Sequence, residues 1–295
     1  MLLKYAWAFL LICGLCCCEK AITFKLNQSP SQIVVDATIE NGMPPQVILS
    51  TSLNYFSKIS PAILESSFVH GALVSISDGN QTRQLTEFAT RLGASGDSVY
   101  YYSIDTLSGG PFLGAFNTGY TLSITASGKQ YTAHTTITSV AKKIDSLWWI
   151  KAPDNPDSSK VVLMARIVDP KGYGNYIRYF TSLNGGPFYP GLNSVFDDQI
   201  TDGTTYSIEV EKGVDRNQTI DVKNYSFFNR GDSVMVKFSN IDKATYDFWR
   251  TMEYDYQSIG NPFSTPTQVL GNISGGGLGY FGGYASEYIS LAIPK

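Results

Sequence analysis

The segment Tyr206-Ser-Ile-Glu-Val-Glu211 alternates bulky apolar side chains with polar ones. Successive residues of a β-strand point to opposite faces, so Tyr206, Ile208 and Val210 would share one face. One buried face and one wet face are typical of an antiparallel sheet that packs on a core. The segment therefore predicts one strand of a β-sandwich.

The same period of two, interrupted by turn residues, recurs along most of the chain and predicts an all-β protein. The predicted strands cover residues 32–40, 46–51, 69–77, 98–104, 120–126, 131–138, 160–168, 176–182, 206–211, 233–239 and 284–293. Residues 242–258 lack this alternation and carry aromatic side chains at helical spacing. They predict one helix, which Asn240 or Asp242 would cap.

A short segment occurs twice, as Ser108-Gly-Gly-Pro-Phe112 and as Asn184-Gly-Gly-Pro-Phe188. Each copy precedes a strand that begins at a tyrosine, Tyr120 in the first case and Tyr206 in the second. This order is typical of the tyrosine corner of immunoglobulin-like sandwiches, in which a buried hydroxyl bonds to the upstream backbone. We therefore predict two immunoglobulin-like β-sandwich units in tandem.

The boundary between these units is predicted from a change of pattern. Strand alternation gives way at residues 138–157, which include the turn Pro153-Asp-Asn-Pro156. The N-terminal sandwich then covers residues 18–140, and the C-terminal sandwich covers residues 141–295 with the helix and a glycine-rich tail. Trp148-Trp149 falls in this join, where packing between the units would bury both rings.

The first residues predict an export signal. Lys4 precedes an apolar run that begins at Ala6 and ends at the last of four cysteines. The run is shorter than the roughly 20 residues that a membrane-spanning helix needs. This layout is typical of a signal peptide, which we place at residues 1–17.

The cysteines at the end of this run predict a lipid anchor. Leu15-Cys-Cys-Cys18 has the layout of a bacterial lipobox, whose cysteine is acylated and becomes the mature N-terminus. We assign the lipid to Cys18 because the polar chain begins at Glu19, and Cys16 and Cys17 are the alternatives. Several acyl chains, at about 0.8 kcal/mol per buried CH₂, would hold the protein on a membrane. An ordinary secretory signal with incidental cysteines is the competing interpretation.

Charge and residue types exclude several function classes. With 22 basic and 25 acidic side chains the chain has a formal charge of −3, so no nucleic-acid partner is expected. Beyond residue 18 the chain has no cysteine, and its only histidines are His70 and His134, both in predicted strands. No catalytic residue, metal site or cofactor is predicted, and we expect a protein that is not an enzyme.

The tail segment Gly277-Leu-Gly-Tyr-Phe-Gly282 has the spacing of a dinucleotide-binding fingerprint. That fingerprint requires a strand-to-helix turn and an acidic residue about 20 positions later, and the chain ends before such a position. Glycines at this density indicate instead that backbone segments approach closely, beside the rings of Tyr280 and Phe281.

Aromatic residues gather in the predicted helix and in the tail. Interface cores favour Tyr, Trp and Phe with few charges, so this region is the predicted contact surface for a partner. The candidate contact residues are Tyr246, Trp249, Tyr254, Tyr256, Tyr280 and Phe281. Burial of these rings against the second sandwich is the alternative.

Several motifs, in their order along the chain, resemble those of one known family. They are Cys18-Glu19, Ile33-Val-Val-Asp-Ala-Thr-Ile-Glu40, Gly71-Ala-Leu-Val-Ser-Ile76, Tyr246-Asp-Phe-Trp249, Asn261-Pro-Phe263, Asn272-Ile-Ser-Gly-Gly and Gly279-Tyr-Phe-Gly282. In these motifs the chain resembles the Bacteroidota outer-membrane lipoproteins grouped as domain of unknown function 4249 (DUF4249). The resemblance implies an outer-membrane lipoprotein, on either leaflet, that accompanies TonB-dependent receptors, and it carries over no catalytic residue.

Three function classes follow from these observations. The leading one is a non-catalytic, membrane-anchored lipoprotein that serves a TonB-dependent outer-membrane uptake system as an accessory or binding component. The alternative is a surface glycan-binding or adhesive module with a glycan or peptide ligand. The third is an enzyme of unknown type.

We expect acylation of Cys18 to be visible in the intact mass of the mature N-terminal peptide, as a lipidated cysteine followed by Glu19. Cys18→Ala should move the chain from the detergent phase to the aqueous phase, because the acyl chains supply the membrane affinity. Loss of detergent partition in Cys16→Ala alone would contradict the assignment.

Overall fold

The computed structural model describes residues 30–53, 60–91, 98–153, 155–221, 223–259, 261, 263–265 and 267–295. The predicted signal peptide and Cys18 lie outside the described residues. The chain divides into the units Met1–Pro30 and Ser31–Lys295, and the fold described here is that of the second unit.

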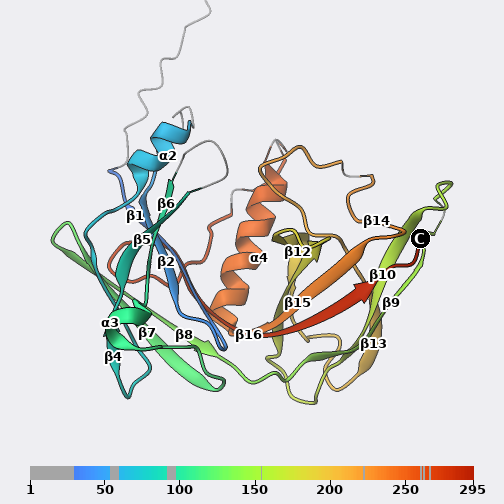
Figure 1. Cartoon of the computed structure of the whole chain (residues 1–295), viewed down its shortest axis with the longest axis horizontal. Coiled ribbons are helices and arrows are strands. Elements are labelled where there is room, and N and C mark those ends of the chain that lie inside the picture. Colours follow the sequence, from blue (N-terminus) through green and yellow to red (C-terminus); the bar gives the residue numbers. More distant parts are fainter. Residues whose placement is uncertain are drawn as a thin grey trace, which may run out of the picture. The chain divides into compact units, whose positions relative to one another are not determined.

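The largest sheet has eight strands and contains both early and late segments of the chain (Figure 1). In spatial order its strands are β12 (Phe188–Phe196), β11 (Tyr176–Leu183), β15 (Ser233–Ile241), β16 (Leu278–Ala292), β1 (Ile33–Glu40), β2 (Gln46–Thr51), β6 (Ser98–Ser103) and β5 (Thr86–Arg91). The prediction of an all-β sandwich fold is confirmed.

Two smaller sheets complete the sandwiches. One consists of β4 (Thr82–Gln84), β3 (Leu73–Ser77), β7 (Thr118–Ala126) and β8 (Lys129–Ile137). The other consists of β13 (Thr205–Val210), β10 (Lys160–Val168), β14 (Phe228–Asn229) and β9 (Lys143–Lys151), which also pairs with β10. The helices are α2 (Pro61–Ser67), α3 (Thr106–Gly109) and α4 (Lys243–Ser258).

Each smaller sheet encloses a separate hydrophobic core with part of the large sheet. The N-terminal core gathers buried residues of β1, β2, β3, β7 and β8, with Leu122 and Ile137 fully buried. The C-terminal core gathers residues of β10, β11 and β15, with Leu163 and Val236 fully buried. The N-terminal core also includes Phe281 and Ala285 from the end of the chain, and the sheet that the two cores share was not anticipated.

Strand β16 joins the two cores. It pairs antiparallel with β15 on one side and parallel with β1 on the other. Phe281 and Ala285 pack in the N-terminal core, whereas Ile289 and Leu291 pack against the C-terminal core. One strand at the end of the chain therefore contributes the same face to both halves.

Glycine is required where β16 meets β1. Gly279 has φ +98°, and a Cβ atom at this position would lie 1.9 Å from the carbonyl oxygen of Val35. A Cβ on Gly282 would lie 2.7 Å from the Tyr280 ring. The tail glycines therefore permit close backbone and ring approach, as the sequence predicted.

Helix α4 begins at Lys243 after the capping residue Asp242, within one residue of the predicted range. Asp242 accepts a hydrogen bond from the Thr245 N–H at 2.8 Å, which satisfies a free donor of the first turn. Its second oxygen accepts from Thr135 Oγ1 at 2.8 Å and from the Thr136 N–H at 3.0 Å, both in β8. The cap thus fixes the start of α4 on the N-terminal sandwich.

The connection between the sandwiches is shorter than the predicted range 138–157, because residues 143–151 form strand β9. Trp148 and Trp149 are half-buried in this strand and are not linker residues, and the guanidinium of Arg230 lies 4.7 Å from the Trp149 ring. The period of two fails in β9 because bulky residues occupy both of its faces.

Lys142 anchors this connection in the interior. Its side chain is fully buried, and its Nζ lies 2.7 Å from a carboxylate oxygen of Asp169. Its backbone N–H donates to Asn240 Oδ1 at 2.9 Å, and Asn240 Nδ2 donates to the Lys142 carbonyl at 2.8 Å. These bonds fix the connection to both sheets of the C-terminal sandwich.

Only one of the two predicted tyrosine corners has the expected bond. The Ala115 N–H donates to the Tyr120 hydroxyl at 2.8 Å, and the Phe112 ring packs edge-on against the buried Tyr120 ring. Tyr206 is half-buried, and its hydroxyl makes no hydrogen bond with any residue that the structure describes. The corner prediction for Tyr206 is therefore wrong, because its ring packs beside Lys142 instead.

We expect Tyr120→Phe to lower the free energy of unfolding by about 1 kcal/mol, because it removes this hydrogen bond and keeps the ring. Tyr206→Phe is the matched control and should change it by less than about 0.3 kcal/mol. Urea unfolding measures both values. Equal effects of the two substitutions would contradict the assignment of the single corner to Tyr120.

Candidate functional site

The candidate site lies on the face of the eight-stranded sheet that the N-terminal core leaves free. In β1, Val35 and Ala37 point into that core, so Asp36, Thr38 and Glu40 point to the opposite face. The parallel register places Asp36 beside Tyr280 and Glu40 beside Tyr284. Strands from both halves therefore supply polar and aromatic side chains to one surface.

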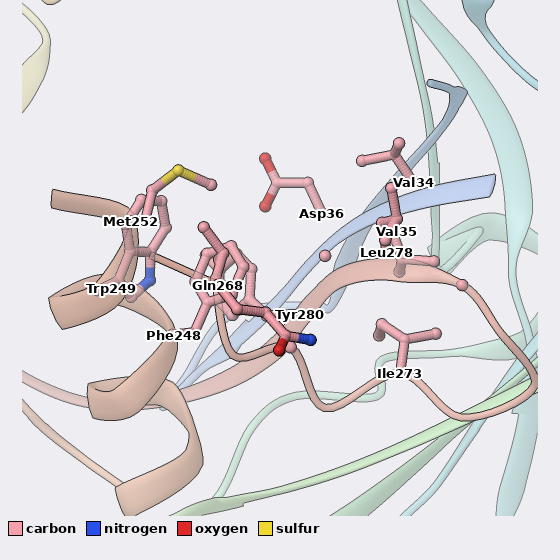
Figure 2. Close-up of a pocket in the computed structure, with 14 residues that line it drawn as sticks. Val34, Val35, Asp36, Phe248, Trp249, Met252, Gln268, Ile273, Leu278 and Tyr280 are labelled. Carbon is pink, nitrogen blue, oxygen red and sulfur yellow. The ribbon is translucent and has the colours of Figure 1, made fainter. Parts of the chain in front are cut away.

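Helix α4 covers part of this surface and encloses an apolar cavity of about 570 Å³ (Figure 2). Phe248, Trp249 and Met252 line it from the helix, and Leu278 lines it from β16. Further lining residues are Val34, Val35, Asp36, Gln268, Val269, Gly271, Ile273, Gly277, Gly279 and Tyr280. The carboxylate of Asp36 points from β1 toward the helix side of this cavity.

A second cavity of about 460 Å³ is more polar and shares Asp36 and Tyr280 with the first. It is lined by Asp36, Thr38, Glu40, Gln46, Ile48, Arg178, Phe180, Phe188, Lys237, Tyr280 and Tyr284. We call the two cavities together the groove. It consists of an apolar compartment and a charged compartment.

Arg178 of β11 is the most constrained charge in the groove. Its side chain is 3 % exposed, and its guanidinium lies 3.4 Å from the Trp249 ring centre and 4.6 Å from that of Phe180. Its Nε donates to Ser194 Oγ and its Nη1 donates to the Tyr284 hydroxyl, both at 3.1 Å. Two rings and two hydrogen bonds thus fix the plane of the guanidinium.

A buried acid, Glu253, is linked to Arg178 through Ser194. Glu253 of α4 is 3 % exposed and accepts hydrogen bonds from the Ser194 Oγ–H at 2.5 Å and the Ser194 N–H at 2.9 Å. Arg216 Nη2 lies 3.1 Å from the same carboxylate. Since Ser194 Oγ donates to Glu253, it accepts the bond from Arg178 and links the helix to the groove.

Two tyrosines connect Arg178 to Asp36. The Tyr284 hydroxyl accepts from Arg178 Nη1 and from Trp249 Nε1, so its own proton is directed to the Tyr280 hydroxyl, 3.3 Å away. The Tyr280 proton is then free to bond Asp36, and this interaction lowers the pKa of the Asp36 carboxyl group.

Desolvation by the surrounding protein has the larger, opposite effect and raises the pKa of Asp36 above its ordinary value of 3.8. The positive charge of Arg178 lowers this pKa, as the Tyr280 hydrogen bond does, but less than desolvation raises it. The Asp36 side chain is nevertheless exposed to the cavity, so solvent there reduces the desolvation. The net effect is that the pKa of Asp36 is raised.

Lys237 and Glu40 form the second charged pair of the groove. The Lys237 ammonium contacts the Glu40 carboxylate, which also accepts a hydrogen bond from the Tyr288 hydroxyl. Burial, with a smaller contribution from this hydrogen bond, raises the pKa of Tyr288. The charge of Lys237 is thus balanced by Glu40.

The predicted contact residues separate into three groups. Trp249 and Tyr280 line the groove, and Tyr280 is itself buried against Phe248 and Trp249. Tyr246 and Phe281 are buried and line neither cavity, since Tyr246 stacks on Tyr176 at 4.8 Å and Phe281 lies in the N-terminal core.

The last two predicted contact residues, Tyr254 and Tyr256, lie outside both cavities. Tyr254 is 52 % exposed, and the Tyr256 ring lies 5.3 Å from the guanidinium of Arg216. The sequence interpretation did not include Asp36 or Arg178, because a single charge in a strand is the usual sign of a solvated face.

The fold and the groove define an all-β sandwich protein with a candidate ligand-binding site on a sheet shared by both halves. The family model of a domain of unknown function (DUF4249) matches residues 19–289, and the chain belongs to this family. No curated protein matches the chain. Among the residues that the structure describes, none of the helices is long and apolar enough to cross a membrane.

We expect Asp36→Asn to be more stable than the parent chain at pH 7. With a raised folded-state pKa, ionised Asp36 costs stability, and this cost develops as the pH rises above the ordinary value of 3.8. Below that value the carboxyl group is neutral in both states, so the difference should disappear.

Urea unfolding at pH 3 and pH 7 measures this difference. Asp145→Asn is the control, because Asp145 is an exposed residue of β9 outside the groove. If Asp36→Asn were less stable than the parent chain at pH 7, ionised Asp36 would stabilise the fold through Arg178 and the conclusion on its pKa would be wrong.

Proposed function

We propose that this protein is a non-catalytic, membrane-anchored lipoprotein that binds a ligand as an accessory component of a TonB-dependent outer-membrane uptake system. The groove is the observation that carries the binding part of the proposal. Family membership, with the resemblance to Bacteroidota outer-membrane lipoproteins, supports the envelope location and the receptor partner.

The dimensions of the groove support ligand binding. Its compartments have volumes of about 570 Å³ and 460 Å³, and ligand sites are typically concave, largely apolar and about 300–1,000 Å³ in volume. A few fixed polar groups orient the ligand in such sites, and Arg178 and Asp36 fill this role here. Strands at both ends of the chain build the groove, so it exists only in the folded whole.

The arrangement of the rings disfavours the glycan-binding alternative for this groove. Phe248 stacks on Tyr280 at 4.3 Å, and Trp249 meets Tyr280 edge-on at 5.1 Å while Arg178 covers one Trp249 face. Sugar rings stack on open aromatic faces, and these faces are largely occupied by neighbouring side chains.

Purification of the full chain from detergent-solubilised outer membranes of its own organism tests this proposal. We expect a TonB-dependent receptor to co-purify in a fixed ratio, and Cys18→Ala to abolish recovery from the membrane fraction. Cys16→Ala is the matched control and should leave recovery unchanged. Recovery of the lipidated chain without any outer-membrane receptor would contradict the uptake role.

A further inference from the structure

We infer that the groove binds a zwitterionic ligand with a large apolar side chain, namely a free amino acid or a short peptide. Its carboxylate would bind Arg178, its ammonium group would bind Asp36, and its side chain would enter the apolar compartment. This inference rests on the proposed binding function and specifies the ligand class.

The first observation is the unused hydrogen-bonding capacity of Arg178. The guanidinium forms no ion pair with any described carboxylate, and its Nη2 donates to no residue that the structure describes. Arg178 is 3 % exposed and lines the charged compartment. A buried, fixed guanidinium with free N–H groups is suited to bind a carboxylate in a planar, bidentate manner.

The second observation is the charge balance of the groove. Lys237 is paired with Glu40, whereas Arg178 and Asp36 are one positive and one negative group that form no ion pair with any residue that the structure describes. A dianionic phosphate would approach two carboxylates, Asp36 and Glu40, and would be repelled. A ligand with one carboxylate and one ammonium group keeps the groove neutral and satisfies both free charges.

The third observation is the surroundings of Asp36. Its carboxylate points into the apolar compartment, among Phe248, Trp249 and Tyr280. An ammonium group next to a carboxylate and aromatic rings gains Coulomb and cation–π stabilisation. Desolvation raises the pKa of Asp36, which agrees with this position of its carboxylate among the rings.

Calorimetric titration of the full chain in detergent tests the inference with four probes. L-phenylalanine and L-phenylalanyl-L-phenylalanine carry both charges, whereas 3-phenylpropanoate lacks the amine and 2-phenylethylamine lacks the carboxylate. We expect at least one zwitterion to bind and both analogues to bind at least tenfold more weakly. The tighter of the two zwitterions identifies the source as a free amino acid or as a peptide.

Two substitutions assign the charges. Arg178→Lys keeps the charge but loses the planar guanidinium. It should lower the affinity for the zwitterion and for 3-phenylpropanoate at least tenfold, and change the affinity for 2-phenylethylamine less than twofold. Asp36→Asn should lower the affinity for the zwitterion and for 2-phenylethylamine and should not lower the affinity for 3-phenylpropanoate. The controls Arg166→Lys and Asp145→Asn alter an exposed ion pair outside the groove and should leave the affinity for all four probes unchanged.

Three results would overturn the inference: no binding of either zwitterion at millimolar concentration, equal affinity for phenylalanine and its analogues, or uniform weakening of all probes by both substitutions. The analogue comparison needs no variant, so it holds even if Arg178→Lys does not fold. If the receptor still co-purifies when these titrations fail, only the ligand class is wrong and the proposed function stands.

Discussion

The parallel pairing of β1 with β16 is the constraint on which the rest of the structure depends. Its register runs from Val34 beside Leu278 to Glu40 beside Tyr284, between opposite ends of the folded unit. The close approach requires Gly279, whose absent side chain leaves room for the backbone of Val35. Without this pairing the two sandwiches would have separate sheets and no common surface.

The same pairing determines the composition of the groove. Strand alternation directs Asp36 to the free face, and the register places Tyr280 directly beside it. The C-terminal sandwich adds Arg178, which reaches Asp36 through the hydroxyl groups of Tyr284 and Tyr280. Helix α4 covers part of this surface, because hydrogen bonds from β8 to its capping residue Asp242 hold its first turn there. The site therefore combines groups from both cores.

Local patterns predicted most of the strands and the one long helix, because alternation and capping are properties of short segments. They did not predict the short elements β4, β5, β14, α2 and α3, or β9. They also did not predict β12, in which Pro190 and Gly191 interrupt the pattern, or the start of β16, whose glycines have no side chains to show a period. The aromatic clustering that selected Trp249 and Tyr280, which line the groove, also selected Tyr246, Tyr254, Tyr256 and Phe281, which line neither cavity. Arg178 was missed because its role arises from long-range pairing.

The central claim is that β16 makes both halves one cooperative unit. Native-state hydrogen exchange, followed by mass spectrometry, measures the opening free energy of each strand. We expect the amides of β1 and β16 to exchange with the same opening free energy, the highest in the protein, and to respond together to low denaturant. Early exchange of β1, while β16 stays protected beside β15, would show that the halves open independently and would contradict the claim.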